Sequence, residues 1–420
     1  MFRKTLLVLA AVLGLAVPAA GAAPTTLTGD LNGAPYRIVV PDNWNGTLVV
    51  HAHGYRDRAD HAGEVDDRHA PAAPGATATD PGLEPALLAQ GYALAGSAYK
   101  TNGWAVQEGI TDTKALVSHF RSAVGQPSRT LLWGFSMGSL VTFALAEQTA
   151  GHFDGYLAAC AVGAGAPRAW DGAIATSLAY KTAFGWNDSW GSVGDLRDDL
   201  DFDTEVLPKM IPEVSDPANF GKFEFIRLVT GTVPFSLPAP GYPGWILTNM
   251  FFGTEGRAEL ERRAGGPVGQ NLTHVYALSP VDKAYLAAFG VNADVLLAQM
   301  NAERTIAAKT SARNYVEHWA DYSGLIKKPL LTLHTQTDSL VPVQHESAYA
   351  ATVDAAGRND LLAQAFTNGN GHCNFTGPQL VTALGALGGW VATGAKPTAA
   401  SFPAALGFLP GFAPPAWPQQ

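Results

Sequence analysis

Three residues that lie far apart in the chain, Ser136, Asp338 and His372, have the types that acyl-transfer chemistry requires. A serine hydroxyl attacks a carbonyl carbon when a base removes its proton, and a histidine held in one tautomer by a carboxylate is such a base. Ser136 stands between Gly134 and Gly138 in the pattern G-x-S-x-G. The pattern alone is weak, because it arises by chance and a serine between glycines can simply cap a helix. The elements around the three residues therefore have to support the interpretation.

The residues around Ser136 predict a strand that turns directly into a helix. An apolar run at 130–133 precedes the pattern, and a helix-like segment follows it at once. Small residues on both sides let strand and helix approach closely, so the hydroxyl stands clear of the carboxyl edge of a sheet. The backbone N–H of Met137 then lies at the helix start, where unpaired donors favour negative charge. We expect this N–H to stabilise an oxyanion.

A second oxyanion donor is expected near the start of the chain. Residues 36–41 and 47–53 read as a pair of strands, with 42–46 as the turn between them. The second strand ends at Gly54, and a glycine in that place lets the next N–H point into a site. We assign the donor to Tyr55; an ordinary turn at the end of a strand is the alternative.

The other two residues of the group also follow predicted strands. Asp338 lies in the loop after an apolar strand at 330–335, and His372 lies in the turn after the last strand. The carboxyl ends of parallel strands meet at one edge of a sheet, so both side chains are expected beside the serine. Two other carboxylates, Asp321 and Asp354, do not directly follow a predicted strand.

The order of elements predicts an α/β core with one long insertion. Strand and helix patterns alternate as in a parallel sheet, and the alternation stops where the chain becomes aromatic and irregular. An insertion at that point leaves the carboxyl edge above the serine and should form a lid; a separate domain with its own core is the alternative. The expected organisation is a core at 23–164 and 326–394, a lid at 165–325 and a proline-rich C-terminal strap at 395–420.

The first 22 residues have the pattern of a secretory signal. Two basic residues precede an apolar run at 6–17, and small residues follow at 20–22. The run is shorter than the roughly 20 residues that cross a bilayer, so we expect no stable membrane insertion. We expect a secreted or periplasmic protein, in a compartment where cysteines can be oxidised.

Composition excludes some partners. The chain has 420 residues, of which 47% are hydrophobic, and this is enough for a large core. A formal net charge of −9 and the lack of a basic stripe argue against nucleic acid and anionic lipid as partners. Acidic and histidine residues gather between 57 and 69, but their spacing matches no defined loop for Ca²⁺ or Zn²⁺. We therefore expect a solvated insertion there and no metal site. We also expect the protein to be a monomer.

Three segments together resemble the α/β-hydrolase superfamily: Gly-Phe-Ser-Met-Gly at 134–138, Thr-Asp-Ser-Leu-Val-Pro at 337–342 and Gly-His-Cys-Asn-Phe at 371–375. They occur in the order that this superfamily requires, and the resemblance covers about residues 36–165 and 325–394. It implies a mostly parallel central sheet flanked by helices. Within this superfamily, the His-Gly-Tyr motif at 53–55 and the Gly-x-Ser-Met-Gly motif around the serine are similar to those of secreted bacterial cutinase-like and polyester hydrolases.

The pair His372-Cys373 resembles the tannase and feruloyl esterase family, in which a cysteine beside the serine bridges to the cysteine beside the histidine. This chain departs from the family, because Phe135 precedes Ser136. A bridge from Cys160, at the end of the neighbouring predicted strand, would hold the histidine loop in another way. Two free buried cysteines are the alternative.

The function expected from these residues is hydrolysis of a small-molecule or polymeric ester through an acyl-enzyme, without a metal or organic cofactor. Tyr55 and Trp104 are expected to line the substrate pocket. The insertion holds too many large aromatic residues for a solvated loop; they are Trp186, Trp190, Phe223, Phe225, Phe251 and Phe252. Some of them should pack within the insertion itself, and the rest should complete the pocket walls and favour aromatic or medium-chain acyl groups. A secreted exopeptidase and a non-catalytic binding module on the same fold are the alternatives.

Overall fold

The computed structural model describes residues 23–56, 77, 81–148, 151–232 and 243–417. The signal sequence expected at 1–22 and the acidic and histidine residues between 57 and 69 lie outside this part of the chain. Within it, we find no helix with the length and hydropathy of a membrane span.

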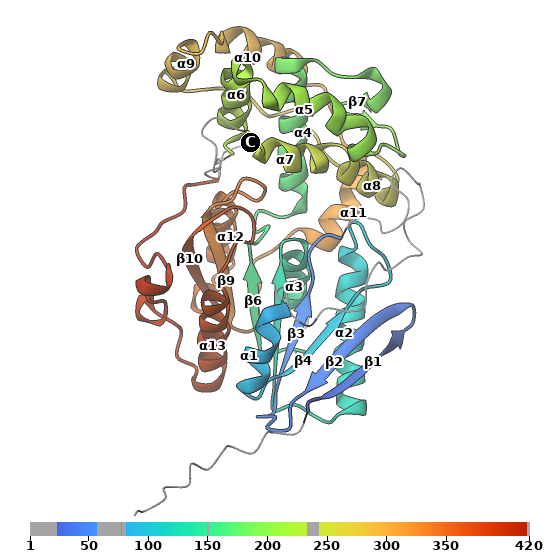
Figure 1. Ribbon diagram of the computed structural model, residues 1–420, viewed down its shortest axis with the longest axis vertical. Helices are drawn as coiled ribbons and strands as arrows, with labels where there is room; N and C mark the ends of the chain where they lie inside the picture. The colour runs from blue at the N-terminus through green and yellow to red at the C-terminus, as the bar shows by residue number, and fades with distance from the viewer. Residues whose placement is uncertain (1–22, 57–76, 78–80, 149–150, 233–242, 418–420) are drawn as a thin grey trace, which may run out of the picture.

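An eight-stranded sheet forms the centre of the molecule (Figure 1). Its strands are β1 (Thr25–Leu31), β2 (Ala34–Val40), β3 (Thr47–Ala52), β4 (Ala93–Ser97), β5 (Arg129–Phe135), β6 (Gly155–Ala159), β9 (Leu330–Thr337) and β10 (Leu362–Asn370). They are ordered β1-β2-β4-β3-β5-β6-β9-β10; β2 is antiparallel to both of its neighbours, and the strands from β4 to β10 are parallel. The prediction of a mostly parallel sheet is confirmed.

One strand pairing expected from the sequence is wrong. The strands at 36–41 and 47–53 do not pair with each other, because β4 lies between them. The turn that joins them binds elsewhere: the N–H of Asn45 donates to the carbonyl of Gly91 (2.9 Å), and the Asn45 side chain donates to Gln90 (2.9 Å). These bonds hold the turn against the residues that lead into β4.

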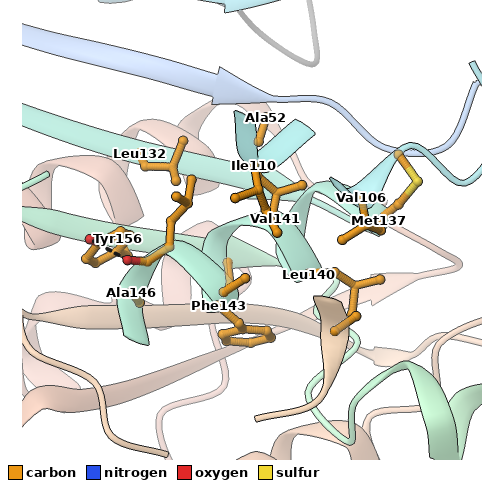
Figure 2. Packing of buried hydrophobic residues seen from close by; sticks show 14 of the residues in the cluster. Ala52, Val106, Ile110, Leu132, Met137, Leu140, Val141, Phe143, Ala146 and Tyr156 are labelled. Carbon is orange, nitrogen blue, oxygen red and sulfur yellow. Dashed lines mark hydrogen bonds between the residues drawn. The ribbon is translucent and has the colours of Figure 1, made fainter. Parts of the chain in front are cut away.

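Helices cover both faces of the sheet. On one face lie α2 (Val106–Ala123), α3 (Met137–Gln148) and α12 (Gln344–Ala355), and on the other α1 (Glu84–Ala89), after the 3-10 turn Pro81–Leu83, and α13 (Gly377–Thr393). The side chains of β3 alternate accordingly, since Leu48 and Val50 join the first apolar layer and Val49 joins the second. Figure 2 shows part of the first layer. Burial of β5 between the two layers fixes the position of the serine that follows it.

The insertion forms a helical cap above the carboxyl ends of the strands (Figure 1). It runs from α4 (Ala166–Phe184) to α11 (Thr310–Ala320) and includes α5 (Leu207–Ser215), α6 (Phe220–Thr230), α7 (Trp245–Gly253), α8 (Glu255–Ala264), α9 (Pro280–Ala287), α10 (Ala293–Ala302) and a short pair β7 (Gly191–Ser192) and β8 (Asp195–Leu196). Most of its buried apolar side chains form a cluster of their own. Trp170, Leu260 and Val268 instead join the first apolar layer of the core. The insertion is thus both a cap with its own packing and a continuation of the core.

The C-terminal segment packs along the sheet edge. Phe402 and Phe408 belong to the second apolar layer, and Phe408 forms an isolated bridge with Thr367 of β10. The last described residue, Trp417, lies against His345 at the start of α12, with ring centroids 4.6 Å apart. This contact brings the end of the chain back to the carboxyl edge.

Candidate active site

Ser136 occupies a sharp turn between β5 and α3. Its backbone is in the left-handed region, with φ of 54°, which a residue other than glycine rarely adopts. The flanking glycines are sterically required. A Cβ on Gly134 would lie 2.1 Å from the carbonyl oxygen of Gly138, and a Cβ on Gly138 would lie 2.1 Å from that of Ala52. Both contacts are far closer than carbon and oxygen allow, so the sequence pattern serves the tight crossing of strand and helix.

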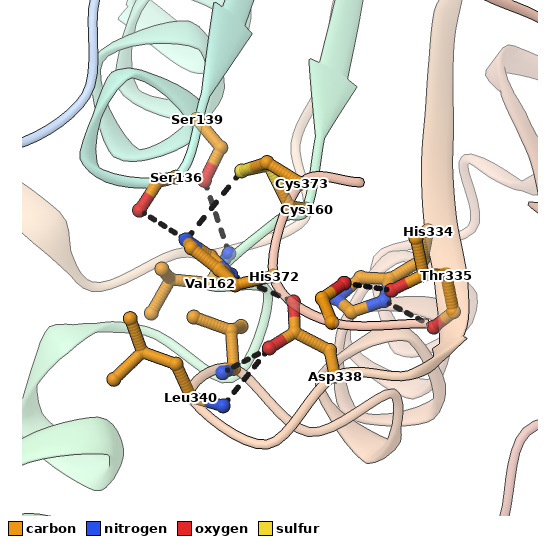
Figure 3. The surroundings of a disulfide bond; sticks show 12 residues. Ser136, Ser139, Cys160, Val162, His334, Thr335, Asp338, Leu340, His372 and Cys373 are labelled. Carbon is orange, nitrogen blue, oxygen red and sulfur yellow. Dashed lines mark hydrogen bonds and ion pairs between the residues drawn. A yellow bond between two sulfur atoms is a disulfide. The ribbon is translucent and has the colours of Figure 1, made fainter. Parts of the chain in front are cut away.

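The three residues singled out by sequence lie in one hydrogen-bonded chain (Figure 3). His372 Nε2 is 2.8 Å from Ser136 Oγ, and His372 Nδ1 is 2.7 Å from Asp338 Oδ2. A charged carboxylate only accepts hydrogen bonds, so Nδ1 carries the hydrogen and Nε2 is free to accept a proton from the serine. This is the arrangement that activates a serine as a nucleophile.

Asp338 is fully buried and held from two sides. Its Oδ1 accepts the N–H groups of Leu340 and Val341, each at 2.9 Å, while Oδ2 faces His372. Burial alone would raise the pKa of Asp338, but attraction to His372 and the hydrogen bonds outweigh it, so the pKa lies below its usual value. The carboxylate therefore stays charged and orients the imidazole.

Cys160 and Cys373 form a disulfide, with their Cα atoms 5.1 Å apart (Figure 3). Cys160 directly follows β6 and is anchored by its N–H to the carbonyl of Leu333 (2.8 Å). Cys373 directly follows His372. The bond therefore ties the histidine loop to the middle of the sheet, one strand away from the serine.

Thiol titration tests this bond. The unfolded but unreduced protein is expected to show no free thiol, and the same sample after reduction should show both of its cysteines. The double variant Cys160→Ser/Cys373→Ser serves as a blank for the reagent. Two titratable thiols before reduction would contradict the bond, while the hydrogen bonds of His372 would still be available for the chemistry.

The two expected oxyanion donors, Tyr55 and Met137, both line the pocket beside Ser136. Met137 is the first residue of α3, where backbone N–H groups have no partner within the helix. The backbone of Gly54 passes close to the turn that holds Ser136, since a Cβ on Gly54 would lie 3.4 Å from Ser136 Cβ. The structure thus brings both candidate residues to the serine.

His53, to which the sequence assigned no role of its own, supports this loop. Its ring stacks on Tyr99 at 3.9 Å, and its Nδ1 lies 2.7 Å from the carbonyl oxygen of Gly54. Burial lowers the pKa of His53 to about 3, so the ring is neutral and donates from Nδ1. A fixed carbonyl at Gly54 in turn fixes the peptide that carries the Tyr55 N–H.

An apolar pocket of about 150 Å³ opens above Ser136. Its aromatic lining residues are Tyr55, Trp104, Trp170, Phe252 and Trp417. Of the six aromatic residues expected from the insertion, only Phe252 lines it; the other five pack in the apolar cluster of the cap. Trp170, Trp417 and Arg168 were missed by sequence reasoning. Trp170 and Arg168 lie on α4, the first helix after the carboxyl end of β6, and this position in the chain could have indicated them.

The order of the strands, the serine at the turn after β5 and the acid and histidine in loops after β9 and β10 together identify the fold. The chain has the α/β-hydrolase fold. No family model matches it. A segment of 137 residues is 28% identical to the o-phthalyl amidase of Xanthobacter agilis, which is 32% of this chain and 26% of the amidase. The similarity thus spans about a quarter of that relative's length.

Several solved structures align with the chain at low similarity. An esterase from Pyrococcus furiosus aligns with 84% of this chain and 84% of its own at 14% identity, with a TM-score of 0.39. Feruloyl esterase B from Aspergillus oryzae aligns with 89% of this chain and 80% of its own at 13% identity, with a TM-score of 0.40. The acylaminoacyl peptidase of Pyrococcus horikoshii aligns with 84% of this chain and 38% of its own at 10% identity, with a TM-score of 0.39.

Proposed function

We propose that the protein is a serine hydrolase that cleaves carboxylic esters through an acyl-enzyme. The observation that carries this proposal is the hydrogen-bonded chain from Ser136 through His372 to Asp338, opening into an apolar pocket. His372 takes the proton of Ser136 as Oγ attacks the carbonyl carbon, and the N–H groups of Tyr55 and Met137 bind the oxyanion. His372 then gives the proton to the departing alcohol. Water, activated by the same ring, releases the acid and restores the serine.

The lining of the pocket argues against an aminopeptidase. An aminopeptidase needs a carboxylate to hold the charged amino terminus of its substrate, and no carboxylate lines the pocket among the described residues. Amide hydrolysis is a second candidate, supported by the o-phthalyl amidase to which part of the chain is similar. A purely binding role is disfavoured, because the three residues keep their types and their mutual hydrogen bonds.

The place of action is part of the proposal. We propose that the mature chain works outside the cytoplasm, secreted or periplasmic. The signal pattern at 1–22 and a disulfide beside the histidine loop both support this compartment.

A series of 4-nitrophenyl esters tests the substrate class. A cavity of about 150 Å³ is known to hold a benzene ring, so butyryl and benzoyl esters should have a higher kcat/KM than the acetyl ester. The preference should be graded, because one methylene is worth only about 1 to 3 kcal/mol in an apolar pocket. Phe252→Leu removes a ring from the pocket wall and should reduce the preference for the larger acyl groups. Phe220→Leu, on α6 and outside the lining, should leave this preference unchanged.

Two results would contradict this assignment. One is a clear maximum at the acetyl ester, which would mean that the aromatic walls do not hold the acyl group. The other is faster cleavage of the matching 4-nitroanilides than of any ester, which would favour the amidase candidate.

A further inference from the structure

Arg168 is the one charged side chain among the described residues that line the pocket. The chain as a whole has a formal net charge of −9, so its overall charge does not account for a lone cation in the pocket. The Nε of Arg168 donates to the carbonyl of Ala164 at 2.7 Å, and its guanidinium has no ion pair within the described residues. Arg313, by contrast, is paired with Asp171, on the same helix as Arg168 (2.7 Å). The remaining N–H groups of Arg168 are therefore available to a ligand.

Helix stability does not explain this arginine. Arg168 lies in the first turn of α4, which begins at Ala166. The N-terminus of a helix carries partial positive charge, and a cation there is disfavoured. A group that costs stability and faces a binding pocket is a candidate for recognition.

A histidine stands on the same wall. His345 is buried and lines the pocket, and its Nδ1 accepts the N–H of Ala164 at 3.1 Å. Because Nδ1 accepts, the ring hydrogen is on Nε2. Burial lowers the pKa of His345 to about 3, so the ring is a neutral donor that adds no repelling or attracting charge of its own.

Trp417 completes the wall from the C-terminal segment. Its ring contacts His345 edge to face at 4.6 Å, and the Arg168 guanidinium lies 6.0 Å from a Trp417 ring centroid. An indole face beside a guanidinium restrains the orientation of that group and excludes water from one side. Both effects strengthen an ionic hydrogen bond to a ligand.

We propose that Arg168, with His345 and Trp417 beside it, binds a carboxylate of the substrate, so that the preferred esters carry an anionic group. This inference rests on the proposed ester hydrolase function. A planar guanidinium fork matches a carboxylate. One cation with neutral neighbours suits a single negative charge; a doubly charged phosphate monoester would leave one charge uncompensated in an apolar pocket.

Matched substrate pairs test the proposal with the wild-type enzyme. One pair places the carboxylate on the acyl side: mono-4-nitrophenyl adipate against 4-nitrophenyl hexanoate. The other places it on the alcohol side: the butyryl ester of 4-hydroxybenzoate against that of 4-hydroxybenzamide. We expect the anionic member of at least one pair to have the higher kcat/KM, chiefly through a lower KM. No preference in either pair overturns the inference, while no turnover of any of the four overturns the ester hydrolase function itself.

Variants then assign the preference to Arg168. Arg168→Gln should lower the anionic-to-neutral ratio of kcat/KM by about 10- to 100-fold, the usual effect of losing hydrogen bonds to a charged group. Arg168→Lys should keep part of the preference for the anionic ester. Arg358→Gln is the control, because Arg358 is exposed and precedes β10 at the opposite edge of the sheet. An unchanged ratio in Arg168→Gln overturns the assignment. If that variant does not fold, wild-type inhibition decides: hexanoate should inhibit more strongly than hexanamide, and equal inhibition counts against a carboxylate site.

Discussion

Ser136→Ala is expected to lower ester turnover by about 10⁴-fold or more while leaving the fold intact. The serine acts through one oxygen, which contacts His372 Nε2 at 2.8 Å. Alanine removes that oxygen and no other contact of the side chain, and it is no larger than serine. The backbone strain at this position, with φ of 54°, stays in the variant. Activity should therefore fall without a comparable change in thermal unfolding.

Measuring kcat/KM on 4-nitrophenyl butyrate, together with the melting temperature, checks this expectation. A fluorophosphonate probe adds an independent readout, since it should label the wild type at Ser136 and leave Ser136→Ala unlabelled. Ser122→Ala is a suitable control, because Ser122 is exposed on α2 and bonds only within its own helix. Residual activity within tenfold of wild type would mean that the nucleophile is elsewhere and would overturn the proposed function.

The meeting of Ser136, Asp338 and His372 could be predicted from the sequence because each residue follows a strand. Buried parallel strands are recognisable as apolar runs, and their carboxyl ends share one edge. The glycine pattern added the local geometry, since Gly134 and Gly138 report a close crossing of strand and helix. Chain order and strand pattern therefore located the group without any knowledge of distances.

The pairing of β2 and β3 could not be predicted in the same way. A run of apolar residues followed by a turn and another run is typical of a hairpin. In the structure β4 lies between the two strands, and Asn45 in the turn bonds to Gly91 and Gln90, which lead into β4. Such long-range hydrogen bonds leave no periodic trace in the sequence.

The residues that line the pocket could not be predicted from the sequence either. Arg168, His345 and Trp417 come from three segments remote in sequence, and no motif links them. Most aromatic residues of the cap pack in its own apolar cluster. Phe252 lines the pocket instead, and only the orientation of its side chain on α7 distinguishes it from them. Composition indicates that aromatic surface must be buried, but tertiary packing decides where.

Asp338→Asn is the second variant with a large expected effect. Asparagine keeps an oxygen that can accept the N–H groups of Leu340 and Val341, so the loop should keep its shape. Its amide group, however, presents N–H to His372 Nδ1, which must then accept. The ring hydrogen moves to Nε2, and that nitrogen can no longer accept the proton of Ser136.

The loss expected from this wrong tautomer is on the order of 10⁴-fold in kcat, as for the corresponding change in the serine protease triad. Asp360→Asn is the control, because Asp360 is exposed in the turn before β10. Asp321 and Asp354 offer a sharper comparison: one accepts the N–H of Tyr322 and the other the side chain of Asn359. Asparagine at either position should therefore cost little activity. A large loss there, with little loss in Asp338→Asn, would show that a different carboxylate orients the histidine.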